Sequence, residues 1–161
     1  MSGKKERFDK ILHKIEDVLE EEHIEVARRE ICQLLKENID YYNWVGFYLS
    51  DENGYLTLTE FEGEPTIHTK IRFGEGICGQ AAETKRTFLT NDVSKETNYL
   101  SCSIKVKSEI VVPIMQDSRF IGELDIDSHK LNAFDELDKE FLEKICGLIS
   151  ERTQLKSSDQ R

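Results

Sequence analysis

Residues 109–126, EIVVPIMQDSRFIGELDI, decide the fold because two apolar runs in them are separated by a short polar segment. Both runs are rich in Val, Ile, Leu and Phe, which favour strands, and the QDSR at 116–119 is typical of a turn. The stretch therefore predicts a β-hairpin. Side chains alternate between the two faces of a strand, so Leu124 and Ile126 are expected to pack on the same core.

A second hairpin is predicted nearer the N-terminus, where strands at 44–49 and 55–61 flank the turn signal Asn53-Gly54. Shorter elements are expected between the hairpins: strands at 70–73 and 87–89 and a helix at 77–84. Residues 92–107 show no periodicity and predict a long loop, which in a small domain is usually either functional or disordered.

Helices are predicted at both ends of the chain, over about 7–19, 22–36 and 135–153, because apolar residues recur there every three or four positions. Antiparallel hairpins with helices kept to the chain ends indicate an α+β fold. We expect a central antiparallel sheet with the N- and C-terminal helices packed on one face. Neither a repeat nor a linker is visible, so a single domain is expected.

The charge pattern excludes several classes of partner. The 161 residues include 22 Lys and Arg against 32 Asp and Glu, a formal net charge of -10. Because basic residues are scattered among acids, no nucleic acid is expected as a partner. No stretch approaches the ~20 apolar residues of a spanning helix, so no membrane role is expected. The first residues lack the apolar segment of a secretory signal, and we expect a cytoplasmic location.

The four cysteines lack the spacing of a zinc site, so no metal is expected. They fall into two groups by their surroundings in the sequence. Cys32 and Cys146 lie among apolar positions of predicted helices, where a thiol packs as a small hydrophobic group. Cys78 begins a short helix after a glycine-rich turn, and a helix N-terminus favours the thiolate. Cys102 lies in the long loop close to two lysines, where it is either a reactive thiol or a plain surface one.

Acidic residues share one face of the second hairpin. Asp125 and Asp127 are two apart on a predicted strand, with Glu123 alongside, and Glu109 begins the neighbouring strand. If this face meets water, the strand is an ordinary half-buried one. If the carboxyl groups converge, their repulsion keeps one of them protonated, and a carboxylic acid beside a thiol is a useful general acid.

Aromatic residues crowd the first strand of the other hairpin. Trp44 and Tyr48 share one face of that strand, and they either fill the core or line a pocket for a small ligand. Gly74-Glu75-Gly76 lacks the Lys-Ser/Thr ending of a phosphate-binding loop. By spacing alone, the sequence indicates an α+β domain with a candidate thiol–carboxylate pocket.

At these residues the chain resembles a known family, the free methionine-(R)-sulfoxide reductases, which are built on a lone GAF domain. The matching segments are NWVGFY at 43–48, GEGICG at 74–79, NDV at 91–93, Cys102, SEIVVP at 108–113 and GELDIDS at 122–128. The resemblance implies a single GAF domain over 1–161. Its parts are a helical N-terminal segment at about 5–38, sheet and active-site loops at about 43–128 and a C-terminal helix at about 135–153.

The resemblance also implies an oxidoreductase that reduces free L-methionine (R)-sulfoxide through a cysteine sulfenic acid and a disulfide. Cys102 matches the nucleophile, and Trp44 and Tyr48 match the aromatic wall of the pocket. The matching pocket acids, which bind the sulfoxide oxygen or the substrate's ammonium group, are Glu109, Asp125, Asp127 and Asp92. The resemblance implies thioredoxin as external reductant, no bound cofactor, and a homodimer.

One position departs from the family pattern. Many members carry a further cysteine ten residues before Cys78, and His68 stands there in this chain. The chain therefore resembles a variant class in which Cys78 resolves the sulfenic acid, giving a Cys78–Cys102 disulfide. The alternative is direct reduction of the Cys102 sulfenic acid by an external thiol.

Two other classes of function are consistent with the sequence. A GAF-type module could bind a small ligand as a non-catalytic sensor, although a sensor does not need Cys102 beside Glu109 and Asp125. An interaction domain could dimerise through the helices at the two chain ends, and dimerisation is compatible with catalysis.

Overall fold

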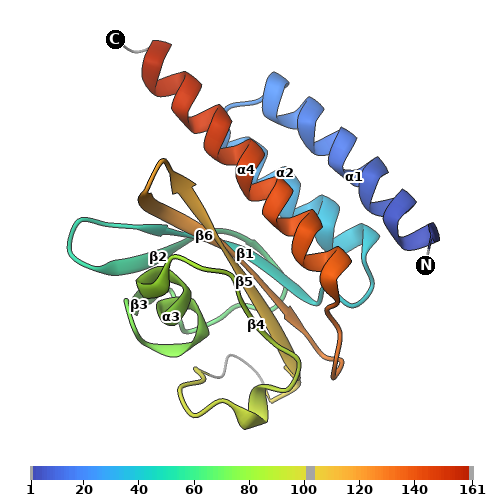
Figure 1. Cartoon of the computed structure of the whole chain (residues 1–161), viewed down its shortest axis with the longest axis vertical. Coiled ribbons are helices and arrows are strands. Elements are labelled where there is room, and N and C mark those ends of the chain that lie inside the picture. The colour runs from blue at the N-terminus through green and yellow to red at the C-terminus, as the bar shows by residue number, and fades with distance from the viewer. Residues whose placement is uncertain (1, 101–103, 160–161) are drawn as a thin grey trace.

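A six-stranded antiparallel sheet forms the centre of the protein in the computed structural model, which describes residues 2–100 and 104–159 (Figure 1). The strand order across the sheet is β3-β2-β1-β6-β5-β4. The strands are β1 Trp44–Ser50, β2 Tyr55–Glu62, β3 Lys70–Arg72, β4 Phe88–Thr90, β5 Ser108–Gln116 and β6 Arg119–Ser128. Each neighbouring pair runs antiparallel, which confirms the predicted sheet and both hairpins.

Three long helices lie on one side of this sheet and one short helix lies on the other (Figure 1). The helices are α1 Ser2–Glu21, α2 Ile24–Asn38, α3 Gly76–Thr84 and α4 Glu136–Asp159, with a 3₁₀ turn η1 at Val93–Lys95. Helices α2 and α4 pack on the strands, and α1 packs on both of these helices. Helix α4 continues six residues past its predicted end, and α1 begins five residues before its predicted start. No helix in the described part of the chain is both long and apolar enough to cross a membrane.

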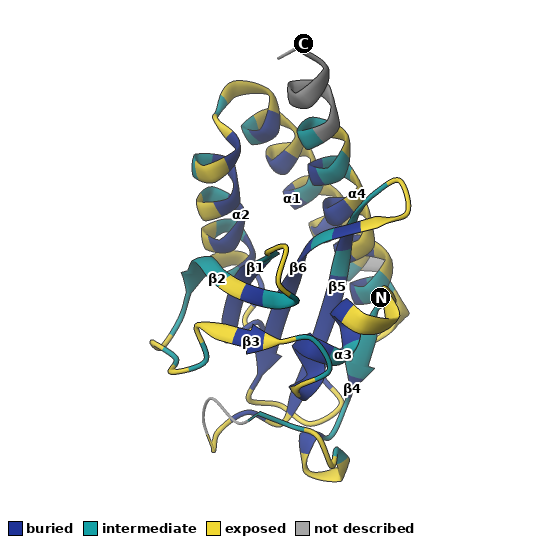
Figure 2. Ribbon diagram, turned by 90° about the vertical axis from the view of Figure 1, so that its left-hand side faces the viewer, coloured by how far each residue is buried: buried dark blue, intermediate teal, exposed yellow. Residues whose placement is uncertain are grey.

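Both faces of the central strands are buried, as Figure 2 shows in dark blue for β1, β5 and β6. Leu124 and Ile126 are both 0% exposed and pack in the core under the helices, as predicted. The opposite face of the same strand is buried by α3 and the loops around it. Strand β6 is therefore not an ordinary half-buried strand with one face in water. This second face carries the acidic residues.

Gly46 fixes the position of an aromatic side chain on that second face. A Cβ atom at Gly46 would clash with the indole ring of Trp44, which lies over the glycine. The ring also stacks on Phe61, with 5.7 Å between the ring centroids and 19° between the planes. The missing side chain at Gly46 therefore lets Trp44 lie flat along β1 and form one wall of the site.

Candidate functional site

Strand register brings four carboxyl groups together on the face away from the long helices. Glu123, Asp125 and Asp127 alternate along β6, so all three point to one side, and Glu109 of β5 pairs directly with Asp127. Their exposed fractions are 5% for Glu109, 0% for Glu123 and 3% for each aspartate. Of the two alternatives that the sequence left open, the structure has the one in which Glu109, Asp125 and Asp127 converge, and Glu123 is a fourth member.

Helix α3 adds a thiol to this acid cluster. Cys78 is buried, and its Sγ lies 3.3 Å from Asp125 Oδ2 and 4.0 Å from Glu109 Oε2. The turn before α3 needs glycine at Gly74 and Gly76, whose φ angles are 91° and 65°. The turn also needs Gly79, because a Cβ there would approach the Arg72 carbonyl oxygen to 2.6 Å. These glycines let α3 lie close against the acidic face.

Burial and mutual repulsion keep the cluster protonated. Burial raises the pKa of Glu109 well above its ordinary value, and the charges of Asp125 and Asp127 raise it further. Burial also raises the pKa of Asp127 well above its usual range, and the charge of Asp125 raises it further. For Asp125 burial raises the pKa, while hydrogen bonds from Glu109 and Cys78 oppose that rise. Glu109 and Asp127 therefore favour their protonated forms.

The expected thiolate at Cys78 is wrong for the resting protein. Burial raises the pKa of the Cys78 thiol well above its ordinary value, and the carboxyl groups of Asp125, Glu123 and Glu109 raise it further. The partial positive charge at the start of a helix is worth about 0.3–1 kcal/mol at exposed sites, which is too little to offset burial beside several acids. Cys78 is therefore a neutral thiol that donates a hydrogen bond to Asp125.

The same side chains are close enough to hold one metal ion. Donor atoms of Cys78, Glu109 and Asp125 lie within 4.8 Å of one another.

Replacing Asp127 by Asn is expected to stabilise the protein more at about pH 8 than at about pH 4, where carboxyl groups ordinarily titrate. A group whose pKa is raised by folding contributes stability that is present below its unfolded pKa and lost as the pH rises through its folded pKa. Asn has no such proton to lose, so the variant should gain about 1–3 kcal/mol across this range.

Urea titrations of the Asp127→Asn variant and the parent at both pH values measure this gain. Glu52→Gln, at an exposed position in the turn between β1 and β2, is the matched control and should show no such change. A stability difference between Asp127→Asn and the parent that is the same at both pH values would contradict the interpretation.

Two aromatic side chains form the wall beside the acids. Trp44 pairs with Asp127 across the strands, and Tyr48 pairs with Glu123, so both aromatic groups face the cluster side of the sheet. Their rings lie 6.4 Å apart between centroids. The Trp44 indole donates to the Glu64 carbonyl oxygen at 3.0 Å, and the Tyr48 hydroxyl donates to that of His68 at 2.8 Å. The sequence left open whether Trp44 and Tyr48 fill the core or line a pocket. In the structure both side chains are buried and both lie next to the acid cluster.

A small cavity reaches the cluster at Asp127. It has a volume of about 40 Å³ and is lined by Asn43, Trp44, Glu64, Pro65, Val106, Asp127 and His129. That volume is about one water molecule's share of liquid volume, so a ligand the size of an amino acid requires the bordering segments to move. Glu64, one of the lining residues, has its Oε1 3.6 Å from Lys105 Nζ, and both side chains are more than half exposed.

Three residues singled out from the sequence do not have side chains placed in the buried cluster. Asp92 is not in the buried cluster: its Oδ1 accepts hydrogen bonds from the Ser94 amide at 3.1 Å and the Ser94 hydroxyl at 2.6 Å, which caps η1. Cys102 lies outside the described residues, so its role stays a prediction. His68 contributes its backbone carbonyl, not its side chain, to the contact with Tyr48.

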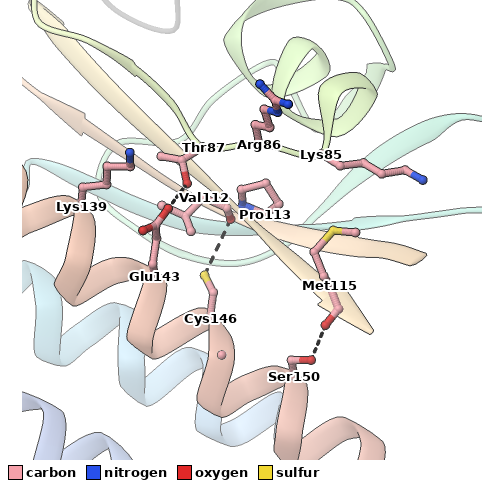
Figure 3. Close-up of a pocket in the computed structure, with 11 residues that line it drawn as sticks. Lys85, Arg86, Thr87, Val112, Pro113, Met115, Lys139, Glu143, Cys146 and Ser150 are labelled. Atoms are coloured by element: carbon pink, nitrogen blue, oxygen red, sulfur yellow. Dashed lines mark hydrogen bonds between the residues drawn. The ribbon is translucent and has the colours of Figure 1, made fainter. Parts of the chain in front are cut away.

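A large groove lies away from this cluster, between α4 and β5 (Figure 3). Its volume is about 590 Å³, and Lys85, Arg86 and Lys139 surround it. Inside it, the Cys146 thiol donates to the Val112 carbonyl oxygen, and other polar groups of the walls are paired in the same way. Because β4 pairs only with residues 109–111 of β5, the side chains of Cys146 and Ser150 on α4 can donate to two β5 carbonyl oxygens beyond that pairing, those of Val112 and Met115. Cys146 and Cys32 are buried, as predicted.

An antiparallel sheet with the long helices on one face and a short helix with loops over the other is the arrangement of the GAF class of domains. The chain belongs to the GAF domain family, whose sequence pattern matches residues 21–151. The chain is 40% identical over 148 residues to "GAF domain-containing protein A" of Dictyostelium discoideum, covering 91% of this chain and 92% of the relative.

Two further relatives carry a name for an activity. A Saccharomyces cerevisiae protein called free methionine-R-sulfoxide reductase is 44% identical over 111 residues, covering 67% of this chain and 61% of the relative. An X-ray structure of free methionine-R-sulfoxide reductase from Neisseria meningitidis, in complex with its substrate, is 35% identical with a TM-score of 0.91. That match covers 97% of this chain and 93% of the other.

Proposed function

We propose that this protein is an oxidoreductase that reduces free methionine-R-sulfoxide to methionine with its own thiols and carboxyl groups. The observation that carries the proposal is the buried contact of the Cys78 thiol with Asp125 and Glu109, at 3.3 and 4.0 Å, beside the aromatic pair. Relatives and a close structural neighbour that bear the name of this activity support it.

In the first proposed step, Cys102 attacks the sulfoxide sulfur and ends bonded to the oxygen as a sulfenic acid. Methionine leaves as the thioether, so its sulfur is reduced by two electrons and the cysteine is oxidised by two. The sulfoxide oxygen needs a proton as its bond to sulfur breaks. Glu109 is suited to supply it, because burial keeps its carboxyl group protonated near neutral pH.

In the second proposed step, the Cys78 thiol attacks the sulfenic sulfur, which forms a Cys78–Cys102 disulfide and releases water. A dithiol reductant, for which we propose thioredoxin, then returns both cysteines to thiols by disulfide exchange. Leu100, two residues before Cys102, packs against Gly76, two residues before Cys78, which supports this pairing. Only after this reduction does the protein return to its starting state.

We further propose that the substrate's thioether end lies against Trp44 and Tyr48 and that acidic groups bind its ammonium group. Asp127 borders the small cavity and is the first candidate for that contact, in which the ammonium group would favour its ionised form, with Asp92 at the start of η1 as a second. A homodimer is compatible with this chemistry. A non-catalytic sensor is the weaker reading, because binding alone gives no reason to bury a thiol among acids.

The proposed activity is tested by turnover of free methionine-R-sulfoxide, its S epimer and a peptide-bound sulfoxide, with thioredoxin, its reductase and NADPH as the coupled reductant. We expect NADPH oxidation with the free R epimer and little with the other two. No turnover of the free R epimer with either thioredoxin or dithiothreitol would reject the enzyme and favour the sensor.

The proposed disulfide is tested separately by mass spectrometry of the protein after one turnover without reductant. We expect a Cys78–Cys102 peptide pair, and in Cys78→Ser an accumulated Cys102 sulfenic acid that dimedone traps. A single-turnover product that lacks this pair would instead favour direct reduction of the sulfenic acid by an external thiol.

A further inference from the structure

One thiol and two carboxyl groups from three separate elements meet in the acid cluster. Cys78 comes from α3, Glu109 from β5 and Asp125 from β6, and each side chain is at most 5% exposed. Cys78 Sγ lies 3.3 Å from Asp125 Oδ2 and 4.0 Å from Glu109 Oε2, and donor atoms of all three residues lie within 4.8 Å of one another. Because the three residues come from different elements, they form no short sequence motif, and sequence spacing does not reveal them as a metal site.

These distances are close to the ligand spacing of a tetrahedral zinc ion. Zinc binds thiolate sulfur at about 2.3 Å and carboxylate oxygen at about 2.0–2.2 Å, so a sulfur and an oxygen on one tetrahedral ion lie about 3.5–3.7 Å apart. The two distances from Cys78 Sγ fall on either side of that range, and small side-chain shifts would bring both atoms into it. Magnesium and calcium prefer six or more oxygen ligands, so the thiol favours zinc.

The same cluster holds buried oxygens without a donor or a cation beside them. Asp125 Oδ1, Asp127 Oδ1 and both carboxyl oxygens of Glu123 are buried, and no amide, hydroxyl or basic group of the described residues donates to them. Among the ion pairs of the described residues, none includes these side chains or Glu109. Buried charges in proteins are paired or coordinate metals. The free oxygen of Asp125 belongs to the carboxyl group that contacts Cys78, which indicates a cation as the partner of this group.

We propose that Cys78, Glu109 and Asp125 bind one zinc ion, with water at the fourth position. On binding, the thiol and the Glu109 carboxyl group release their protons to solvent and coordinate as thiolate and carboxylate, and no electron is transferred. The small cavity beside Asp127 is the route of entry, and its lining includes His129, whose imidazole is a common zinc-binding group.

The consequence is reversible inhibition, and only this part of the inference rests on the proposed function. Zinc would occupy both the thiol proposed to resolve the sulfenic acid and the carboxyl group proposed to protonate the sulfoxide oxygen. A chain with zinc bound is therefore inactive until a chelator removes the ion.

Binding is measured on the reduced, substrate-free protein by titration with zinc against a chromophoric chelator, and with Co²⁺ as a spectroscopic substitute for zinc. We expect one zinc ion per chain and, with Co²⁺, a thiolate-to-metal charge-transfer band that Cys78→Ser removes. Glu109→Gln and Asp125→Asn should each weaken binding at least about tenfold, because even partners outside the ligand set contribute about 10–100-fold. A parent that binds no zinc, or a Cys78→Ser variant that keeps the band, overturns the proposal.

Controls separate this site from other thiols and from loss of the fold. Glu52→Gln in an exposed turn and Cys146→Ala at a buried thiol should bind zinc as the parent does. Cys102→Ala should keep the charge-transfer band, and its loss there would assign the ion to the other cysteine and overturn the site. Circular dichroism checks the fold of every variant, and if Asp125→Asn does not fold, Glu109→Gln carries the same test.

Inhibition is measured as methionine formed in a single turnover without reductant, because dithiol reductants also bind zinc. One equivalent of zinc should slow this step by about 10²-fold or more, the usual contribution of the general acid that it occupies, and EDTA should restore the rate. Zinc that binds at Cys78 and leaves the rate unchanged overturns the inhibition. A parent that forms no methionine even without zinc counts against the proposed function alone, since the binding test uses no substrate.

Discussion

Replacing Glu109 by Gln is expected to lower kcat for free methionine-R-sulfoxide by about 10²–10⁴-fold, the usual contribution of a general acid. Glu109 is 5% exposed, and its pKa is raised by burial and by the charges of Asp125 and Asp127, so it holds a proton near neutral pH. Gln keeps the size and one hydrogen-bond donor of the protonated acid but cannot release a proton. The loss should therefore fall mainly on kcat rather than on KM.

The measurement is steady-state turnover in the thioredoxin-coupled assay, with Glu52→Gln as the control and Cys102→Ala as the inactive reference. We also expect single-turnover formation of the Cys102 sulfenic acid to slow by the same factor, since the acid acts in that step. A Glu109→Gln variant with a kcat within about threefold of the parent would remove this residue from the proton transfer, since a general acid contributes at least about 10²-fold.

Most of the fold follows from local patterns in the sequence. Strand periodicity places Leu124 and Ile126 in the core, and Asn53-Gly54 marks the turn of the first hairpin, with Gly54 at a φ of 82°. The end of α4 is less predictable. Residues 154–159 are polar apart from Leu155, and a helix that has already begun extends through them at little cost because leucine, lysine and glutamine are good helix formers.

The candidate site was only partly predictable, because its chemistry depends on what covers the second face of the sheet. A period of two puts Glu123, Asp125 and Asp127 on one side, but the period does not say that α3 and the loops around it bury that side. For the same reason, the position of Cys78 at a helix start predicts a thiolate, whereas the buried acids around it favour the neutral thiol. The family resemblance predicts Asp92 in the pocket. Its side chain instead accepts hydrogen bonds from the amide and hydroxyl of Ser94 and caps the 3₁₀ turn η1.

A second buried acid has a structural role that the sequence does not indicate. Asp138 of α4 is 0% exposed and accepts hydrogen bonds from both tyrosine hydroxyls before β1, Tyr41 and Tyr42, each at 2.7 Å. It also accepts from Lys4 of α1 at 2.8 Å and from the Asp135 amide at 3.0 Å. One carboxylate therefore joins the first helix, the last helix and the segment that leads into the sheet.

Replacing Asp138 by Ala is expected to lower the free energy of unfolding by about 3–5 kcal/mol, the range found when one partner of a buried ion pair is removed. The variant leaves the Tyr42 hydroxyl, on a side chain 1% exposed, without its acceptor, and Lys4 loses its buried carboxylate partner while it keeps the exposed Asp135 at 2.9 Å. Asp135→Asn is the matched control. Asp135 is more than half exposed, and Asn can still cap α4, so its loss should stay below about 1 kcal/mol. Urea denaturation at neutral pH measures both values, and equal losses in the two variants would show that the network adds nothing beyond the cap.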